Sequence, residues 1–142
     1  MPDNLNRMLS RLAIAHRNAV AGAMTEIGLH PGQAGVLFSL WDQDGLSQAD
    51  LARELGVAAP TVNVLVSKLL DQGFVEVKAC TEDGRLKRVY LTDKADEIRS
   101  EAEKRIAALE DTVLKGFSDL EKSAALMILN RLSENLNCQG SQ

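Results

Sequence analysis

The chain has 142 residues, of which 45% are hydrophobic, and a formal net charge of −4 at pH 7. This length fits one compact domain, and no apolar run can span a bilayer because Arg, Asp, Glu or Lys interrupts each one. Met1 to Asn4 lack a basic segment leading into an apolar core, so neither a secretory signal nor a membrane partner is expected, and a cytoplasmic location is predicted.

Two helices are predicted in the first third of the chain. Apolar residues recur at helical spacing from Asn4 to Ile27, and Gly28 ends this stretch. Pro31 begins a shorter helix that reaches Trp41, and Asp44-Gly45 then breaks the chain.

The next stretch predicts a helix, a tight turn and a second helix. Ser47-Gln48-Ala49-Asp50 is a capping box that opens the first helix, and Gly56 stands where that helix stops. Pro60 presets the start of the second helix, residues 60–72, which ends before Gly73.

A two-stranded hairpin follows. Phe74 to Lys78 and Lys87 to Leu91 alternate apolar and polar residues, and Asp83-Gly84 is the turn signal between them. The hairpin forms a wing over residues 75–91. Together these elements predict a winged helix-turn-helix, a fold whose second helix usually enters the DNA major groove.

Two long helices complete the chain. Thr92 is the expected N-cap of the first, and Ser118-Asp119-Leu120-Glu121 is a capping box that opens the second. The predicted fold class is mainly α with a small β wing. A single domain, 1–142, is expected, with dimerisation helices at 1–28 and 93–137, the DNA-binding part at 31–92 and a flexible tail at 138–142.

The terminal helices have apolar faces that a small winged-helix core cannot cover alone. A two-fold homodimer would cover them and would set two recognition helices about 34 Å apart. The alternative is that these helices fold back on their own core.

Positive charge is local. Residues 61–92 carry five basic and four acidic side chains, whereas 1–60 carry four and six and 93–142 carry seven and ten. Any DNA contact is therefore expected around the second helix and the wing.

Over its whole length the chain resembles the MarR family of bacterial transcriptional regulators. The matching stretches are Leu46 to Ala52, Thr61-Val62, Leu69 to Val75, and above all Asp83-Gly84-Arg85 followed by Val89-Tyr90-Leu91-Thr92. The resemblance implies a six-helix homodimer, a palindromic double-stranded DNA operator, repression, and release from DNA by a small aromatic effector. The effector and the residues that bind it are not indicated.

In the wing, the family's arginine falls on Arg85 and would enter the minor groove, where a narrow groove concentrates negative potential. Asp83 would hold Arg85 or the hairpin in register, and Lys87 and Arg88 would neutralise phosphates. A solvated hairpin tip with no specific role is the alternative.

The recognition helix departs from the family pattern, because no arginine follows Thr61-Val62-Asn63-Val64 and Lys68 is its one basic residue. Asn63 is a candidate partner for adenine, and Thr61 or Val64 for a thymine methyl group. The residues expected to face DNA are Ala59, Pro60, Thr61, Asn63, Val64, Ser67 and Lys68. The acidic net charge leaves open a winged-helix protein-interaction module with weak or lost DNA binding.

Other signals are weaker. Cys80 ends the first wing strand, where it is either a packing residue or a redox switch. His16 lies within the first helix, where it either lines a cavity between the dimerisation helices and the winged core or is a satisfied or solvent-facing histidine. No metal-ligand spacing, phosphate loop or catalytic set is found, so neither a cofactor nor enzymatic activity is expected.

Overall fold

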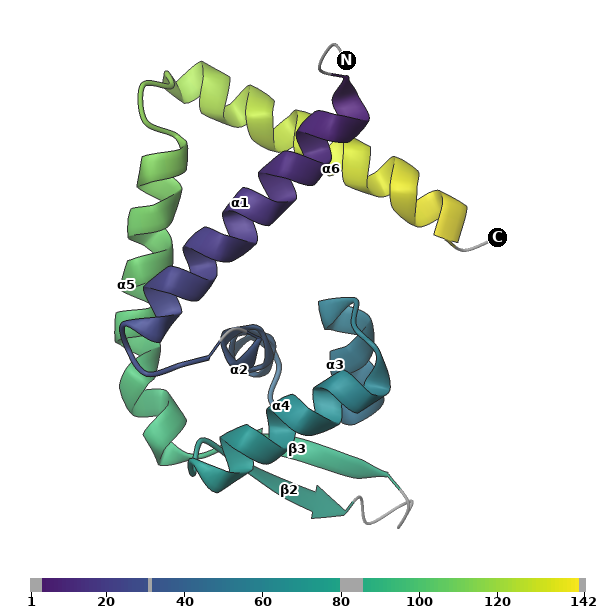
Figure 1. The fold of residues 1–142 in the computed structure, drawn as a ribbon, viewed down its shortest axis with the longest axis vertical. Helices are drawn as coiled ribbons and strands as arrows, with labels where there is room; N and C mark the ends of the chain where they lie inside the picture. Colours follow the sequence, from purple (N-terminus) through teal and green to yellow (C-terminus); the bar gives the residue numbers. More distant parts are fainter. Residues whose placement is uncertain (1–3, 31, 80–85, 141–142) are drawn as a thin grey trace. The chain divides into compact units, whose positions relative to one another are not determined.

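A computed structural model describes residues 4–30, 32–79 and 86–140 of the chain. Over these residues it is mainly helical with a small sheet, which confirms the predicted fold class (Figure 1). The elements in chain order are α1 (Leu5–Thr25), α2 (Gln33–Asp42), β1 (Leu46–Ser47), α3 (Gln48–Leu55), α4 (Ala59–Asp71), β2 (Val75–Ala79), β3 (Lys87–Leu91), α5 (Asp93–Val113) and α6 (Asp119–Gly140). The chain divides into two compact units, 1–107 and 108–142, which are described separately.

The helix-turn-helix forms as the sequence predicts. The Ser47 hydroxyl accepts from the backbone N–H of Asp50 at 3.1 Å, and the Asp50 carboxylate accepts from the Ser47 N–H at 3.2 Å. Gly56 ends α3 in the left-handed conformation with φ of 65°, which costs glycine no steric strain. Helix α4 begins at Ala59, one residue earlier than predicted, so Pro60 is the second residue of the helix and not the first.

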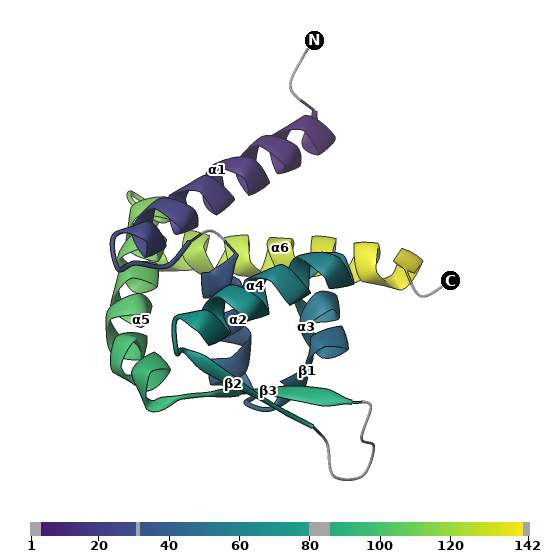
Figure 2. The ribbon, with the colours of Figure 1, turned by 60° about the horizontal axis from the view of Figure 1, so that its bottom comes forward.

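The sheet is antiparallel with strand order β1-β3-β2. The predicted hairpin is confirmed, with Val75 opposite Leu91 and Ala79 opposite Lys87. Strand β1 was not predicted, because two residues are too few to show an alternating pattern. Helices α2, α3 and α4 contact the sheet, and Figure 2 shows the hairpin running along the side of α2 and α4.

A single hydrophobic core joins these elements within the first unit. Its fully buried large residues come from the end of α1, from α2, α3 and α4, and from the two wing strands. They are Met24, Leu29, Val36, Leu37, Leu40, Leu51, Val62, Leu69, Val75 and Val89.

One helix boundary and one expected cap differ from the sequence prediction. Helix α2 begins at Gln33, after Gly32 with φ of 90°, rather than at Pro31, which lies outside the described residues. Thr92 precedes α5 as expected, but its hydroxyl donates to the Gly73 carbonyl at 2.6 Å. This bond ties the start of α5 to the end of α4.

Helix α1 is anchored at its end and exposed along its length. Its Asn4 cap accepts from the Arg7 N–H at 2.9 Å. Met24 is buried near its end, and Glu26 just beyond it pairs with Arg105 of α5. The exposed apolar side chains of α1 are Leu5, Met8, Leu12 and Ile14.

The second unit, 108–142, holds the end of α5 and all of α6. The predicted capping box forms, with Ser118 and Glu121 exchanging bonds of 3.0 and 3.2 Å, and these bonds lower the pKa of Glu121. Helix α6 runs to Gly140, into the stretch predicted as a flexible tail from residue 138. Exposed apolar side chains in this unit are Val113, Phe117, Leu120, Leu126, Met127, Ile128, Leu129 and Leu136.

Candidate nucleic-acid interface

Helix α4 has one buried and one exposed face. Val62, Val66 and Leu69 point into the core at spacings of four and three residues, as an amphipathic helix requires. Every α4 residue that the sequence predicts to face DNA is exposed. These residues are Ala59, Pro60, Thr61, Asn63, Val64, Ser67 and Lys68.

The exposed face has hydrogen-bonding and apolar groups with little charge. Asn63 provides an amide, Thr61 and Ser67 provide hydroxyls, and Val64 leaves 54% of its surface exposed. An amide can pair with adenine, and a branched aliphatic side chain can pack on a thymine methyl group. Lys68 is the single cation on α4.

The start of the helix-turn-helix is held by local hydrogen bonds. The bonds from the Ser47 side chain and backbone are the main reason that the pKa of Asp50 is lowered, and Arg53, which pairs with Asp50, adds to the effect. The capping box therefore stabilises the carboxylate form of Asp50, whose negative charge also suits the positive end of a helix.

Two helices, α2 and α5, hold the end of α4. The fully buried Gln33 accepts from the His30 N–H at 2.9 Å and donates to the Gln72 side chain at 3.0 Å. Lys94 of α5 donates to the Gln72 carbonyl at 2.5 Å and lies 4.6 Å from the Phe74 ring centroid. The recognition helix is thus fixed to the start of α2 and to α5.

The predicted wing residues have different surroundings. Asp83 and Arg85 lie outside the described residues, as does Cys80. Lys87 is exposed. Arg88, predicted to neutralise a phosphate, is half-buried, and its Nη1 donates to the Gly45 carbonyl at 2.9 Å. The sequence analysis missed this internal partner because it interpreted Asp44-Gly45 only as a break.

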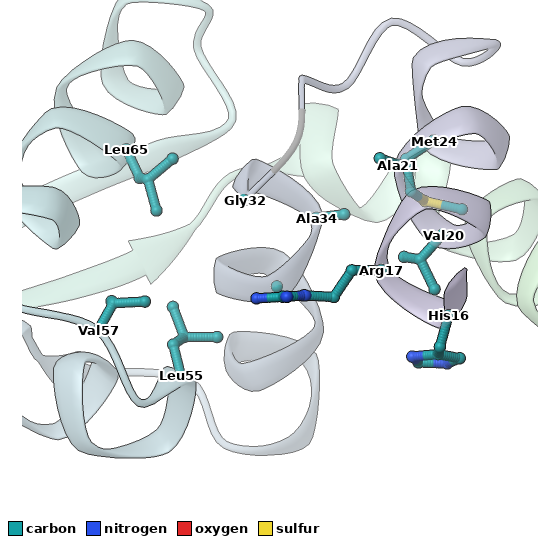
Figure 3. A pocket seen from close by; sticks show the side chains of 11 residues that line it. His16, Arg17, Val20, Ala21, Met24, Gly32, Ala34, Leu55, Val57 and Leu65 are labelled. Atoms are coloured by element: carbon teal, nitrogen blue, oxygen red, sulfur yellow. The ribbon is translucent and has the colours of Figure 1, made fainter. Parts of the chain in front are cut away.

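A cavity of about 340 Å³ lies within the first unit (Figure 3). Its wall comes from α1, the start of α2, the α3–α4 turn and the back of α4. The lining residues are His16, Arg17, Val20, Ala21, Met24, Gly32, Ala34, Gly35, Leu55, Val57 and Leu65. His16 lies in the wall of this cavity and is also exposed, so its position combines the two alternatives that the sequence left open. The wall is apolar except for His16 and Arg17.

Neither a metal-binding cluster nor a membrane-spanning helix is present in the part of the chain that the structure describes. Among those residues, no three His, Cys, Asp or Glu side chains come together as a metal site. Within the same ranges, no helix is both long and apolar enough to cross a membrane.

The exposed face of α4 beside an antiparallel hairpin defines a winged helix-turn-helix protein. The MarR family profile matches residues 27–86. These 60 residues include α2, α3, α4 and the first wing strand. Over this range the chain matches the MarR family, and it has the fold of that family's transcriptional regulators.

Solved structures agree in fold. A MarR transcriptional regulator from Methanosarcina mazei Go1 is 24% identical, with a TM-score of 0.86 over 92% of this chain and 94% of that one. The transcriptional regulator PA3341 is 29% identical, with a TM-score of 0.83 over 94% and 98%. The repressor CouR, bound to a 23-mer DNA duplex, is 24% identical, with a TM-score of 0.82 over 92% of each chain.

Proposed function

We propose that this protein is a homodimeric repressor that binds a palindromic operator through α4 and the wing and is released by a small aromatic ligand. The observation that carries the proposal is the α4 surface. Its groups suited to base recognition are exposed, while the opposite face is buried in the core. That division is the one a helix needs to enter the major groove and stay attached to its domain. The similar repressor CouR is bound to a DNA duplex.

Dimerisation is supported by apolar surface in both units. Helix α1 exposes Leu5, Met8, Leu12 and Ile14, and α6 exposes a further set that includes Leu129 and Leu136. Large apolar side chains exposed in such number along a helix are typical of an interface. A two-fold axis would give two copies of α4 and explain a palindromic site.

The cavity is the proposed effector site. Its size suits a ligand of one or two rings, its wall is largely apolar, and Arg17 supplies a positive charge. The ligand class is therefore a small aromatic acid. Leu65, on the back of α4, lies in the cavity wall, so an occupant would contact the recognition helix directly and bias its position.

The first experiment is selection of binding sites from a random duplex library, followed by fluorescence anisotropy on the selected and a scrambled duplex. We expect an A/T-leaning palindrome. Asn63→Ala should weaken binding to that site by about 1–3 kcal/mol and leave binding to scrambled DNA unchanged. Asn18→Ala, on the exposed surface of α1, is the matched control. Equal losses on both duplexes would contradict base recognition by Asn63.

The effector is tested by isothermal titration with benzoate and 2-hydroxybenzoate. Arg17→Ala should weaken binding of either acid, because it removes the cation in the cavity wall. Arg7→Ala removes an equal charge from the exposed start of α1 and should leave binding unchanged. Heat signals unaffected by Arg17→Ala would exclude this cavity as the site.

A protein-interaction module is the second candidate function. The observation that favours it is the scarcity of cations on α4, where Lys68 stands alone, because phosphate neutralisation supplies much of DNA affinity. Failure of the library selection to enrich any duplex would favour this function.

A further inference from the structure

The Asp44-Gly45 turn is bonded to the middle strand of the sheet. The Gly45 N–H donates to the Val89 carbonyl at 3.1 Å, and the Gly45 carbonyl accepts from Arg88 at 2.9 Å. The Asp44 carboxylate accepts from the Leu91 N–H, 47 residues away, at 2.9 Å. The same oxygen accepts from the Gly45 N–H at 3.0 Å. One short turn therefore holds three residues of β3, namely Arg88, Val89 and the last residue, Leu91.

The strand register explains the role of the carboxylate. Strand β1 pairs with β3 only through Leu46 opposite Val89 and Ser47 opposite Arg88. Continued by two residues, this antiparallel register would set Asp44 opposite Leu91. The backbone turns away at Gly45, where φ is 76°, so no strand carbonyl is available there. The Asp44 side chain replaces that carbonyl.

The ring of Tyr90 packs against the Asp44-Gly45 turn. A Cβ atom added to Gly45 would lie 2.9 Å from Cε1 of the Tyr90 ring, so the turn is packed directly on that ring. Lys78, from the neighbouring strand, places its Nζ 5.3 Å from the centroid of the same ring. The turn, β3 and β2 therefore form one packed unit on the outer side of the hairpin.

The position of the wing follows from this contact. Strand β3 pairs with β2 at five positions, from Val75–Leu91 to Ala79–Lys87, so any movement of β3 carries β2 with it. On one edge β3 is held by β2, and on the other by the two residues of β1 and the Asp44-Gly45 turn. Because β1 has only two residues, much of the bonding to that edge of β3 comes from the Asp44-Gly45 turn.

We propose that Asp44 is a positioning residue for DNA binding, which fixes the wing beside α4 by taking the place of a strand carbonyl opposite Leu91. Arg88 belongs to the same anchor through its bond to Gly45. This assignment rests on the proposed function, in which the wing meets DNA while α4 occupies the major groove.

The charge of Asp44 makes the assignment sharply testable. Removal of a carboxylate from a DNA-binding surface reduces electrostatic repulsion of phosphates and should tighten binding. Loss of a wing anchor should weaken binding. The two mechanisms therefore predict opposite signs for Asp44→Ala. Asparagine keeps the Oδ1 acceptor and removes the charge, so Asp44→Asn separates the hydrogen bonds from the charge.

The experiment measures anisotropy on the library-selected duplex and on scrambled DNA, with the active fraction determined by stoichiometric titration well below the melting temperature. We expect Asp44→Ala to weaken selective binding about tenfold, in line with loss of a well-formed hydrogen bond. Asp44→Asn should bind as well as the wild type or more tightly. Asp42→Ala, which removes an exposed carboxylate two residues earlier, is the charge-matched control and should not weaken binding.

A double variant tests whether Asp44 acts through the wing. If it does, Asp44→Ala in an Arg85→Ala background should cause less than about a twofold further loss, because the displaced contact is already gone. Full additivity would overturn the assignment. Asp44→Ala that binds as tightly as the wild type, or Asp44→Asn that binds as poorly as Asp44→Ala, would overturn it too. A wild-type chain that selects no duplex would overturn the proposed function and this assignment with it.

Discussion

Gln33→Leu tests the bond network that holds the recognition helix to α2. Gln33 is fully buried and makes two hydrogen bonds, one with the His30 N–H at 2.9 Å and one with the Gln72 side chain at 3.0 Å. Leucine has a similar volume but neither forms nor replaces these bonds. The loss of two neutral hydrogen bonds, each worth about 0.5–1.5 kcal/mol net, predicts destabilisation of about 1–3 kcal/mol.

The single tryptophan supplies the assay. Trp41 is buried in α2, with its ring 5.1 Å from that of Phe38 in an edge-to-face contact, so its fluorescence should change when the core opens. For a chain of this length the expected fall in Tm is about 3–10 °C. Wild type and variant must be compared at equal protein concentration, because the proposed dimerisation would make Tm depend on concentration.

Two further variants complete the test. Gln43→Leu changes an exposed glutamine at the end of α2 and should shift stability by less than about 0.5 kcal/mol. Gln72→Leu removes one of the two bonds, so the double variant should lose less than the sum of the single losses. A Gln33→Leu chain as stable as the wild type would refute the reasoning, because it would mean that the buried amide contributes nothing net.

Three other outcomes are expected. The pKa of Asp50 is lowered in the folded state, so the stabilisation by its carboxylate is present above the usual aspartate pKa of 3.8 and is lost as the pH falls through the lower folded-state pKa. The difference in Tm between wild type and Asp50→Asn should therefore depend on pH below about 4. A difference that stays constant from pH 7 to pH 2 would contradict this. DNA affinity should depend weakly on salt, with a slope of about 0.9 per neutralised phosphate and only a few phosphates per subunit; a slope typical of a dozen contacts on the selected duplex would be inconsistent with the sparse cations of α4. Leu129→Glu, which places a charge on an exposed apolar position of α6, should shift the protein to monomer in sedimentation equilibrium, whereas Ser133→Glu, on an exposed polar position nearby, should leave the dimer intact.

Local signals in the sequence were enough to predict most elements. The Ser47–Asp50 capping box, Gly56 and Pro60 act within a few residues of their position, so they mark the helix-turn-helix without knowledge of the rest of the fold. The exposed face of α4 follows from the three- and four-residue spacing of Val62, Val66 and Leu69.

Contacts between distant residues could not be predicted in this way. The bond from Leu91 to Asp44 spans 47 residues, and the bond from Gln33 to Gln72 spans 39. Arg88 was expected to contact phosphate because it follows another cation in a wing, and a sequence pattern does not show that a carbonyl lies within its reach. These contacts depend on how the turn after α2 lies on the sheet, which is a property of the packed fold.

Helix α4 has two adjacent residues with different surroundings. Val64 is exposed on the side with Asn63 and Ser67, whereas Leu65 lies in the cavity wall with Leu55 and Val57. Substitutions at Leu55 and Val57 would reshape the cavity without altering any side chain of α4. A variant library confined to those two positions would therefore change what the cavity accepts and would leave the residues proposed to contact bases as they are. Under the proposed function, this chain is a practical starting point for sensors that share one operator and respond to different ligands.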